Sequence, residues 1–189
     1  GDRANFAGEV MRLHPDFAAK FRPDAAAVWE TRGAAPLVLT GAVLEAARAE
    51  IARHGHKAHA ASADLSKGDA VRGYVKDAIA VLGGCDLLVN NASAAVRSNA
   101  SWETPETDVA ALMDVNLHGT LNCLAAVVPG MKARGRGHIV NLGSMAGTWM
   151  FPGMPVYGMT KAALHNLSQS LRLDLHGSGV RVSEIAPGR

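Results

Sequence analysis

The sequence predicts an α/β protein of one domain, in which helices cover both faces of a parallel sheet, a doubly wound arrangement. Short, continuous apolar runs are typical of strands buried on both faces; they are residues 36–42, 85–91, 138–142 and 180–186. Longer segments with helical periodicity separate these runs, as the crossovers between parallel strands require. With 189 residues, 48% of them hydrophobic, the chain is long enough to bury one core.

The first 35 residues precede this pattern. Their apolar residues recur every three or four positions, which predicts two helices; these residues are Phe6, Val10, Leu13, Phe17 and Phe21. We interpret residues 1–35 as a helical extension and residues 36–189 as the main domain. A packing role for the extension is favoured over a role as a lid or an oligomer arm.

Composition excludes several classes of partner. A net charge of +2 gives no reason to expect nucleic acid or an acidic membrane surface, and no apolar run reaches membrane-spanning length. Cys85 and Cys123 are isolated in apolar surroundings, which is typical of reduced core residues, so we expect a cytoplasmic protein. His54, His56 and His59 have no fixed fourth ligand, and we expect no metal site.

Three side chains with complementary chemistry lie close together near the C-terminal end. Ser144 is followed by Tyr157 thirteen residues later and by Lys161 four residues after that. Residues four apart share a helix face, so Tyr157 and Lys161 can point at one spot. Taken alone, such a pair is usually an ordinary solvated pair on a helix.

The three groups suit the reduction of a carbonyl. Hydride transfer to a ketone leaves an alkoxide, which needs a proton donor and hydrogen bonds to its oxygen. A free phenol titrates at about pH 10, too high to exchange protons readily at neutral pH, and a neighbouring ammonium favours its charged form. The sequence therefore predicts an acid and base at Tyr157, assisted by Lys161, with a hydroxyl donor at Ser144.

Further motifs accompany this triad in a fixed order. They are Asp64-Leu65, NNAS at residues 90–93, Asn116 within MDVNLHGT, and Pro187-Gly188. With Ser144, Tyr157 and Lys161 they resemble the short-chain dehydrogenase/reductase family, from about residue 36 to the last residue. The resemblance implies a Rossmann-like fold and a nicotinamide-dependent oxidoreductase acting on a carbonyl or a secondary alcohol.

The resemblance also implies residue roles. Tyr157 would be the general acid and base, Lys161 would also hold the nicotinamide ribose, Ser144 would steady the substrate oxygen, and Asn116 would hold a water of a proton path to solvent. For Asn116 a local kink in its helix is the alternative. The implied cofactor contacts, to NAD or NADP, are Thr40, Gly41, Asp64, Leu65, Asn90, Asn91, Ala92, Tyr157, Lys161, Pro187 and Gly188. Asp64 could also cap a helix, a role compatible with a cofactor contact, and Asn90 could simply form a polar turn.

The segment after Ala42 departs from the family pattern. More glycines, a helix and a second strand would follow there, whereas the sequence continues with the helical VLEAARAEIARHG. A strand–helix–strand unit takes about 30 residues, so we expect a break between Ala42 and Val43 with roughly 25 to 30 residues absent, and Cα atoms farther apart than the roughly 3.8 Å of a trans peptide. The family's substrate-covering loop and last strand would likewise follow Arg189.

The remaining elements are predicted from periodicity and turn signals. We expect helices over 43–54, 69–82, 109–134 with an interruption near 128–130, and 157–175, and a strand over 57–63. By resemblance, helices 109–134 and 157–175 would form a homodimer or homotetramer contact. Residues 145–156 are rich in Met, Trp and Phe, which favours an apolar small-molecule substrate, and Arg97 is a candidate handle for an anion.

Two other functions fit the same motifs. A non-catalytic member would keep the fold for binding or assembly, which a true lack of the glycine-rich loop would favour. An epimerase or dehydratase would use the same tyrosine and lysine, although the NNAS and Pro-Gly motifs are less typical of those relatives.

Overall fold

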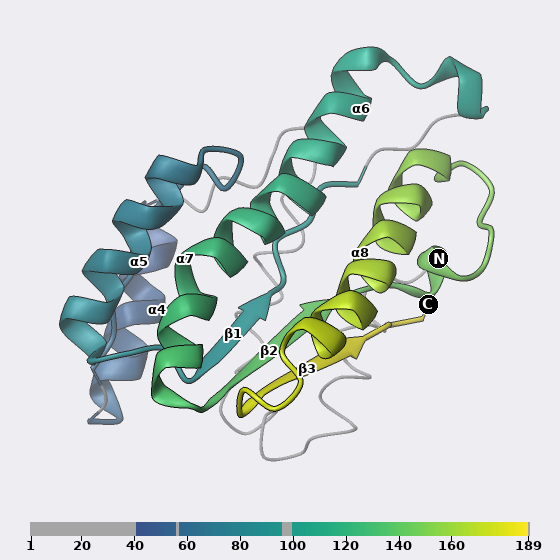
Figure 1. Ribbon diagram of the computed structural model, residues 1–189. Helices are drawn as coiled ribbons and strands as arrows, with labels where there is room; N and C mark the ends of the chain where they lie inside the picture. The colour runs from purple at the N-terminus through teal and green to yellow at the C-terminus, as the bar shows by residue number, and fades with distance from the viewer. Residues whose placement is uncertain (1–40, 56, 96–99, 189) are drawn as a thin grey trace. The chain divides into compact units, whose positions relative to one another are not determined.

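The computed structural model describes residues 41–55, 57–95 and 100–188 (Figure 1). One compact unit comprises residues Val38–Ala186, and the other comprises Gly1–Leu37 with Pro187–Arg189. The predicted extension 1–35, most of the predicted first strand, Thr40 and Arg97 lie outside the described residues. The division into residues 1–35 and 36–189 therefore stays a prediction.

The described strands form one parallel sheet. Its order is β1 (Leu87–Asn90), β2 (Gly137–Leu142) and β3 (Val180–Ile185). Asn90 pairs with Asn141, and Asn141 pairs with Glu184, so the carboxyl ends of all three strands lie at one edge. Three of the predicted strands are confirmed, with ends that shift by one or two residues.

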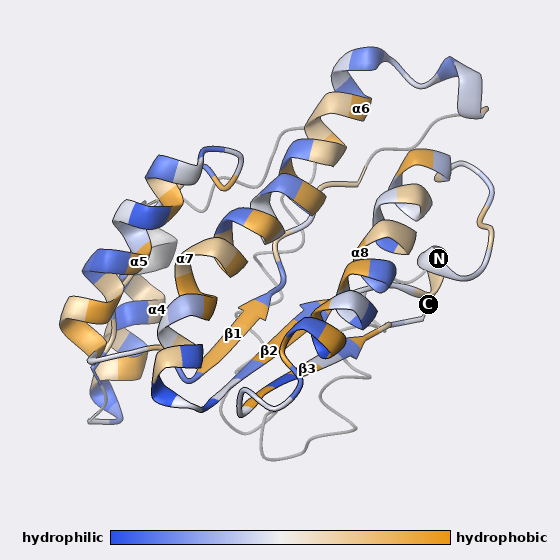
Figure 2. Cartoon of the chain, viewed as in Figure 1, coloured by the Kyte–Doolittle hydropathy of each residue, from blue (hydrophilic) through white to orange (hydrophobic). Residues whose placement is uncertain are grey.

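Helices α7 (Gly119–Arg134) and α8 (Pro155–Asp174) lie along one face of this sheet (Figure 1). Apolar residues from both layers form the core; they are Leu124, Val127, Met131, Ile139, Leu175 and Val180. Figure 2 shows β1 as hydrophobic, β2 and β3 with hydrophobic and hydrophilic residues along the strand, and the helices as mixed, which is the pattern of amphipathic helices packed on a sheet. The α/β class with a parallel sheet is confirmed.

Helix α4 (Gly41–Arg53) bears on the expected break in the chain. The helix runs without interruption through Ala42 and Val43, so the expected wide separation of their Cα atoms is wrong, while the absence of residues between them stays a prediction. Its sequence, GAVLEAARAEIAR, contains strong helix formers and no proline, which explains why it continues as one helix. Gly41 and Ala42 are therefore helical, not the end of a strand.

The predicted strand over residues 57–63 is also wrong. These residues form no strand in the described part of the chain and run directly toward helix α5 (Gly68–Leu82). A strand exists only where a neighbour supplies hydrogen bonds to its backbone. Apolar alternation in the sequence does not reveal whether that neighbour is present.

The long helix before β2 is irregular in an unexpected place. Helix α6 (Glu106–Met113) passes through a π-helical turn, η3 (Asp114–His118), into α7. No interruption occurs near residues 128–130, since Pro129 lies inside α7. By length and composition the stretch Glu106–Arg134 could cross a membrane, but here its α7 part packs into the core.

A line of buried amides and hydroxyls crosses the sheet beneath α8. Nδ2 of Asn90 donates to Oδ1 of Asn141 at 2.9 Å, and Nδ2 of Asn141 donates to Oγ of Ser168 at 2.9 Å. The hydroxyl of Ser168 donates a hydrogen bond to the Leu164 carbonyl at 2.8 Å. These bonds join β1, β2 and α8 in one register.

Replacing Asn141 with Ala would leave the Asn90 amide without this acceptor. Asn141 is completely buried, and a buried polar group that loses its partner costs about 1–3 kcal/mol. We expect urea unfolding to show a loss of roughly 2–3 kcal/mol in the free energy of unfolding. Asn91→Ala, at an exposed position of the same turn, is the control and should change it little. Equal effects would contradict the role of the buried line.

Candidate active site

Ser144 lies just beyond the carboxyl end of β2, where open α/β sheets bind ligands. It begins a short 3₁₀ turn, η4 (Met145–Gly147), and its Oγ accepts the backbone N–H of Ala146 at 3.1 Å. A hydroxyl that accepts one bond can still donate its hydrogen. Ser144 can therefore offer that hydrogen to a substrate oxygen.

Tyr157 and Lys161 lie on one face of α8, one turn apart. The helix begins at Pro155, a residue that suits a first helical position because it lacks an N–H. Nζ of Lys161 lies 5.6 Å from the centroid of the Tyr157 ring. The predicted convergence of these two side chains is thus present in the structure.

Lys161 is buried in an unusual way for a lysine, with 3% of its surface exposed. Its Nζ donates to the carbonyl of Leu142, at the end of β2, at 2.7 Å. Burial lowers the pKa of Lys161 to about 8, and the negative charge of Glu184 opposes this shift. The group is consequently held beside the sheet edge with a charge that changes near neutral pH.

Two glycines let the serine turn lie directly on α8. A methyl group at Gly147 would come within 2.8 Å of the backbone of Lys161, and one at Gly158 would come within 2.8 Å of the Ala146 carbonyl oxygen. Real Cβ atoms do not approach backbone atoms so closely. These glycines therefore set how near Ser144 lies to the helix that carries Tyr157 and Lys161.

Asn116 lies in the π-turn and is 1% exposed. The Oδ1 atom of Asn116 accepts from the backbone N–H of Ala94 at 2.7 Å and from the hydroxyl of Ser93 at 3.2 Å. Its Nδ2 atom donates to the backbone carbonyl of Ala94 at 3.0 Å and to Oγ1 of Thr160 at 2.9 Å. Both donors and both acceptor positions of the amide are used. Asn116 ties the segment after β1 to α8, and its role in a proton path stays a prediction.

The segment before α5 carries the residues that resemblance assigns to adenine. Oδ1 of Asp64 accepts from the backbone N–H of Ser66 at 2.9 Å and from its hydroxyl at 2.7 Å, and these bonds lower the pKa of Asp64. Asp64 therefore forms a local turn, while α5 itself has no side-chain cap. Leu65 packs against Gly119, and its carbonyl accepts from Asn122 Nδ2 at 2.8 Å.

The other predicted cofactor contacts lie in different surroundings. Asn90 is buried, and its amide joins β1 to β2 through the hydrogen bond to Asn141. Asn91 and Ala92 follow β1 and are exposed at the edge where β2 also ends. Gly41 begins α4, and Pro187 and Gly188 follow β3 in the chain. Cofactor contacts by these residues stay predictions.

Sequence reasoning missed several residues that support the site. Asn141, Thr160 and Asn122 are polar residues on apolar helix or strand patterns, which is a usable signal, but their partners are distant in the sequence. Glu184 and His165 were missed as well; they bind each other, and His165 lies one turn of α8 after Lys161.

The donors present fit the ribose of a nicotinamide dinucleotide. An ammonium carries three hydrogens, and in the described part of the chain one of those on Lys161 binds Leu142. The others are suited to donate to hydroxyls such as those of a ribose, and the exposed residues Asn91 and Ala92 lie at the same sheet edge. A parallel sheet with such donors at the carboxyl ends of its strands is typical of α/β proteins that bind a dinucleotide.

Comparisons with known proteins agree with this class. Residues 26–189 match the family model described as short chain dehydrogenase. The chain is similar to the NADP-dependent 3-hydroxy acid dehydrogenase YdfG of Salmonella typhi, with 46% identity over 103 residues, 54% of this chain and 42% of that protein. The chain belongs to the short-chain dehydrogenase family. It spans less than half of the length of that relative.

Solved structures give the same fold. NAD⁺-bound xylitol dehydrogenase matches with a TM-score of 0.74 and 33% identity, over 78% of this chain and 56% of that chain. The closed form of serine dehydrogenase complexed with NADP⁺ matches with a TM-score of 0.73 and 36% identity, over 79% and 59%. The Rossmann-like fold predicted from the sequence is confirmed.

The close packing of η4 on α8 can be tested with Gly158→Ala. The added methyl would overlap the Ala146 carbonyl oxygen, and overpacking of this kind typically costs about 1–3 kcal/mol. We expect thermal unfolding to occur several degrees lower than in the wild type. Gly73→Ala is the matched control, because Gly73 is also helical and has open space around it. A Gly158 variant as stable as the control would contradict the packing.

Proposed function

We propose that the protein is an oxidoreductase that transfers a hydride between NAD or NADP and a carbonyl or secondary alcohol. The observation that carries this proposal is the pair on α8, with the buried Lys161 ammonium 5.6 Å from the Tyr157 ring centroid. The family to which the chain belongs and the NADP-dependent name of its relative support the proposal.

The residues divide the proton chemistry between them. Bound reduced nicotinamide would supply the hydride. The Tyr157 phenol donates a proton to the substrate oxygen in reduction and accepts one in oxidation, and the Lys161 ammonium stabilises the charged phenolate. The Ser144 hydroxyl donates a hydrogen bond to the same oxygen, where negative charge develops. Asn116 holds the segment after β1 against α8, so that the cofactor and the acid lie in fixed positions.

Tyr157→Phe removes the acid and leaves the ring in place. We expect nicotinamide-dependent turnover to fall by at least about a hundredfold, the usual contribution of a positioned general acid. Turnover is followed by NAD(P)H absorbance with three probe alcohols: L-serine, 3-hydroxybutyrate and 1-phenylethanol.

Tyr74→Phe is the matched control. Tyr74 is the other tyrosine of the chain. It lies on α5, and its ring centroid is 5.5 Å from that of His59. This variant should keep wild-type turnover. Substantial turnover in Tyr157→Phe would refute the assigned role of Tyr157.

The substrate that we propose has an apolar part. Trp149 and Met150 lie between Ser144 and Tyr157 in the chain, with 66% and 95% of their surfaces exposed. Exposed apolar side chains beside a site are typical of ligand contacts. The relatives named for 3-hydroxy acids and serine favour a small polar substrate instead, and the three probe alcohols distinguish these classes.

A non-catalytic binding or assembly role is the alternative. In such a protein Tyr157 would have no proton-transfer role. Addition of the protein to NADH or NADPH separates the two, because a protein that binds neither changes neither fluorescence. No observation on the described residues favours an epimerase or dehydratase.

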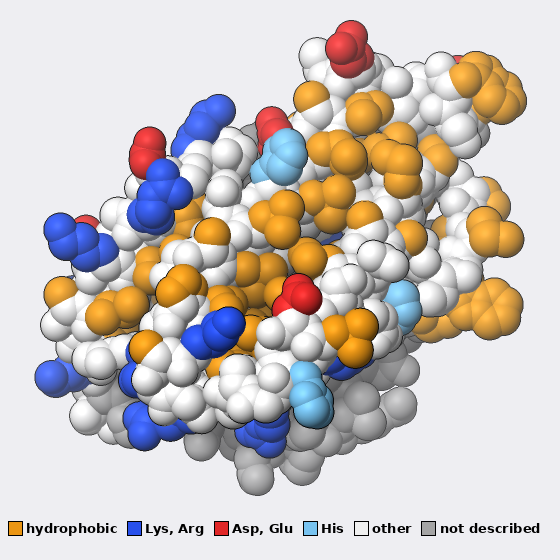
Figure 3. Space-filling model, in the orientation of Figure 1, with side chains coloured by type: hydrophobic (Ala, Val, Ile, Leu, Met, Phe, Trp, Pro, Cys, Tyr) orange, Lys and Arg blue, Asp and Glu red, His pale blue; other side chains and the backbone are white. Residues whose placement is uncertain are grey.

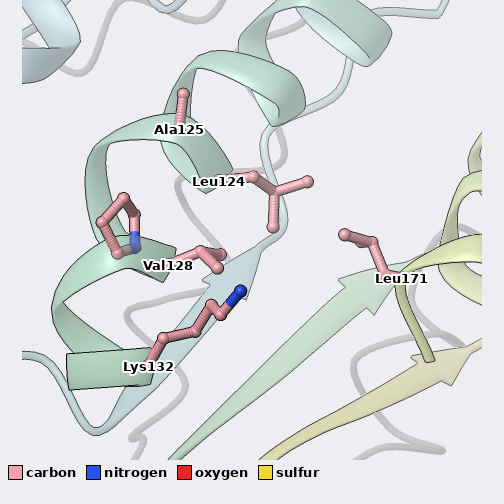
Figure 4. A pocket seen from close by; sticks show the side chains of 6 residues that line it. Leu124, Ala125, Val128, Lys132 and Leu171 are labelled. Carbon is pink, nitrogen blue, oxygen red and sulfur yellow. The ribbon is translucent and has the colours of Figure 1, made fainter. Parts of the chain in front are cut away.

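We further propose a homodimer or homotetramer formed through α7 and α8, the contact implied by resemblance. Hydrophobic side chains gather between these helices, where a groove of about 580 Å³ opens (Figure 3). Figure 4 shows Leu124, Val128 and Leu171 directed into it, with Ala125 and Lys132 at its side. A second copy would cover this apolar surface.

We also propose a cytoplasmic location, since a reducing cytoplasm would suit the two free cysteines, Cys85 and Cys123.

Ala125→Glu tests this surface. Ala125 is exposed on α7, so a carboxylate there leaves the core intact but would be buried without a partner in the dimer. We expect sedimentation to show a loss of assembly in this variant. Ala80→Glu, exposed on α5, is the control and should assemble as the wild type does. A monomeric wild type would contradict the proposed contact.

A further inference from the structure

A carboxylate outside the family motif is buried beside the site. Glu184 lies near the end of β3, and 8% of its side chain is exposed. Its register partner on β2 is Asn141, whose side chain binds Ser168 on α8. Paired residues of a parallel ladder point to the same face, so the Glu184 carboxylate also points toward α8.

Two features hold this carboxylate. Nδ1 of His165 lies 2.8 Å from Oε2 of Glu184. His165 is four residues after Lys161, which places Tyr157, Lys161 and His165 in one row along α8. The other oxygen, Oε1, occupies the space beside Gly143, where any Cβ would overlap it. The residue before Ser144 is thus a glycine at the point where this carboxylate needs room.

The position of Gly143 brings Glu184 near Lys161, because Oε1 of Glu184 lies against Gly143, and Gly143 follows Leu142, whose carbonyl accepts from Nζ of Lys161. Burial lowers the pKa of Lys161 to about 8, and the charge of Glu184 raises it against that effect. The other ionisable groups near α8 are engaged elsewhere or lie apart. In η3, Asp114 and His118 bind each other at 2.9 Å. The acidic residues of α6, Glu106 and Asp108, lie in its first turn. The short turn η4 has no ionisable side chain.

We propose that Glu184 and His165 are positioning residues of the active site, in which Glu184 provides the counter-charge that keeps Lys161 protonated and His165 holds the carboxylate in place. The inference rests on the proposed function, since the charge of Lys161 matters to catalysis only if Tyr157 is the acid and base. Neither residue belongs to the triad. They act through Lys161, whose ammonium stabilises the phenolate.

Removal of the Glu184 charge should lower the pKa of Lys161. Without the Glu184 charge only burial acts on Lys161, so the lysine loses its proton at a lower pH. An opposite charge at close range typically changes a titration midpoint by one unit or more. Glu184→Gln keeps the shape of the side chain and one acceptor oxygen for His165 but removes the charge, so this shift reports charge more than packing.

The test is an NMR titration of the free protein with lysine labelled at ¹³Cε. The Lys161 signal is assigned by its loss in Lys161→Met. We expect a midpoint near pH 8 in the wild type and a midpoint lower by about one pH unit in Glu184→Gln. Glu184→Asp, which keeps the charge, should return most of the shift. Asp174→Asn removes an exposed carboxylate from the same helix and should leave the midpoint unchanged.

His165 is tested in the same way. His165→Ala releases Oε2 of Glu184, so the Lys161 midpoint should fall by less than in Glu184→Gln. His165→Gln keeps an N–H donor and should restore the wild-type midpoint. A wild-type midpoint in His165→Ala would show that His165 does not hold the carboxylate.

These outcomes are independent of turnover. An unchanged Lys161 midpoint in Glu184→Gln would overturn the inference, whether or not the protein is active. A wild type with no nicotinamide-dependent turnover would overturn the proposed function and leave the titration as it is. In an active enzyme, the alkaline limb of the kcat/KM profile should move to lower pH in Glu184→Gln by the same amount as the midpoint.

Discussion

Burial of the Lys161 ammonium constrains the packing of β2, β3 and α8. A lysine that is 3% exposed loses most of its contact with water, and an unpaired charge in such a place is strongly unfavourable. The Leu142 carbonyl accepts a hydrogen bond from the ammonium, the ammonium lies over the face of the Tyr157 ring, and the negative charge of Glu184 favours its protonated form. Each of these groups comes from a different element, so the charged form of Lys161 is stabilised only while β2, β3 and α8 keep this arrangement.

Other polar groups meet the same condition by joining segments that are distant in the sequence. Asn116 is bound to Ala94 and to Thr160, and Asn141 is bound to Asn90 and to Ser168. A buried amide with every bond made specifies one arrangement, because any other leaves donors unpaired. The site is therefore rigid where the proton chemistry is proposed, while Trp149 and Met150 remain exposed beside it.

The sequence predicted what local pattern determines. Apolar runs predicted β1, β2 and β3, and the four-residue spacing placed Tyr157 and Lys161 on one helix face. Residues 57–63 were misassigned because strand formation depends on a partner elsewhere in the chain. Glu184 escaped notice for a related reason. A single acidic residue near the end of a strand is ordinary until the fold pairs it with Asn141 and binds it to His165, one turn of α8 after Lys161.

The π-turn at Asp114–His118 has a consequence for how this helix can change in evolution. The turn contains an extra residue, and each residue of an α-helix advances it by roughly 100°. Side chains on α6 are therefore rotated out of phase with those on α7. Loss of one residue here would remove the bulge and swing Leu112, now fully buried, away from its neighbours. Substitutions can accumulate on the outer surface of this helix, but a change in its length would disturb both halves at once.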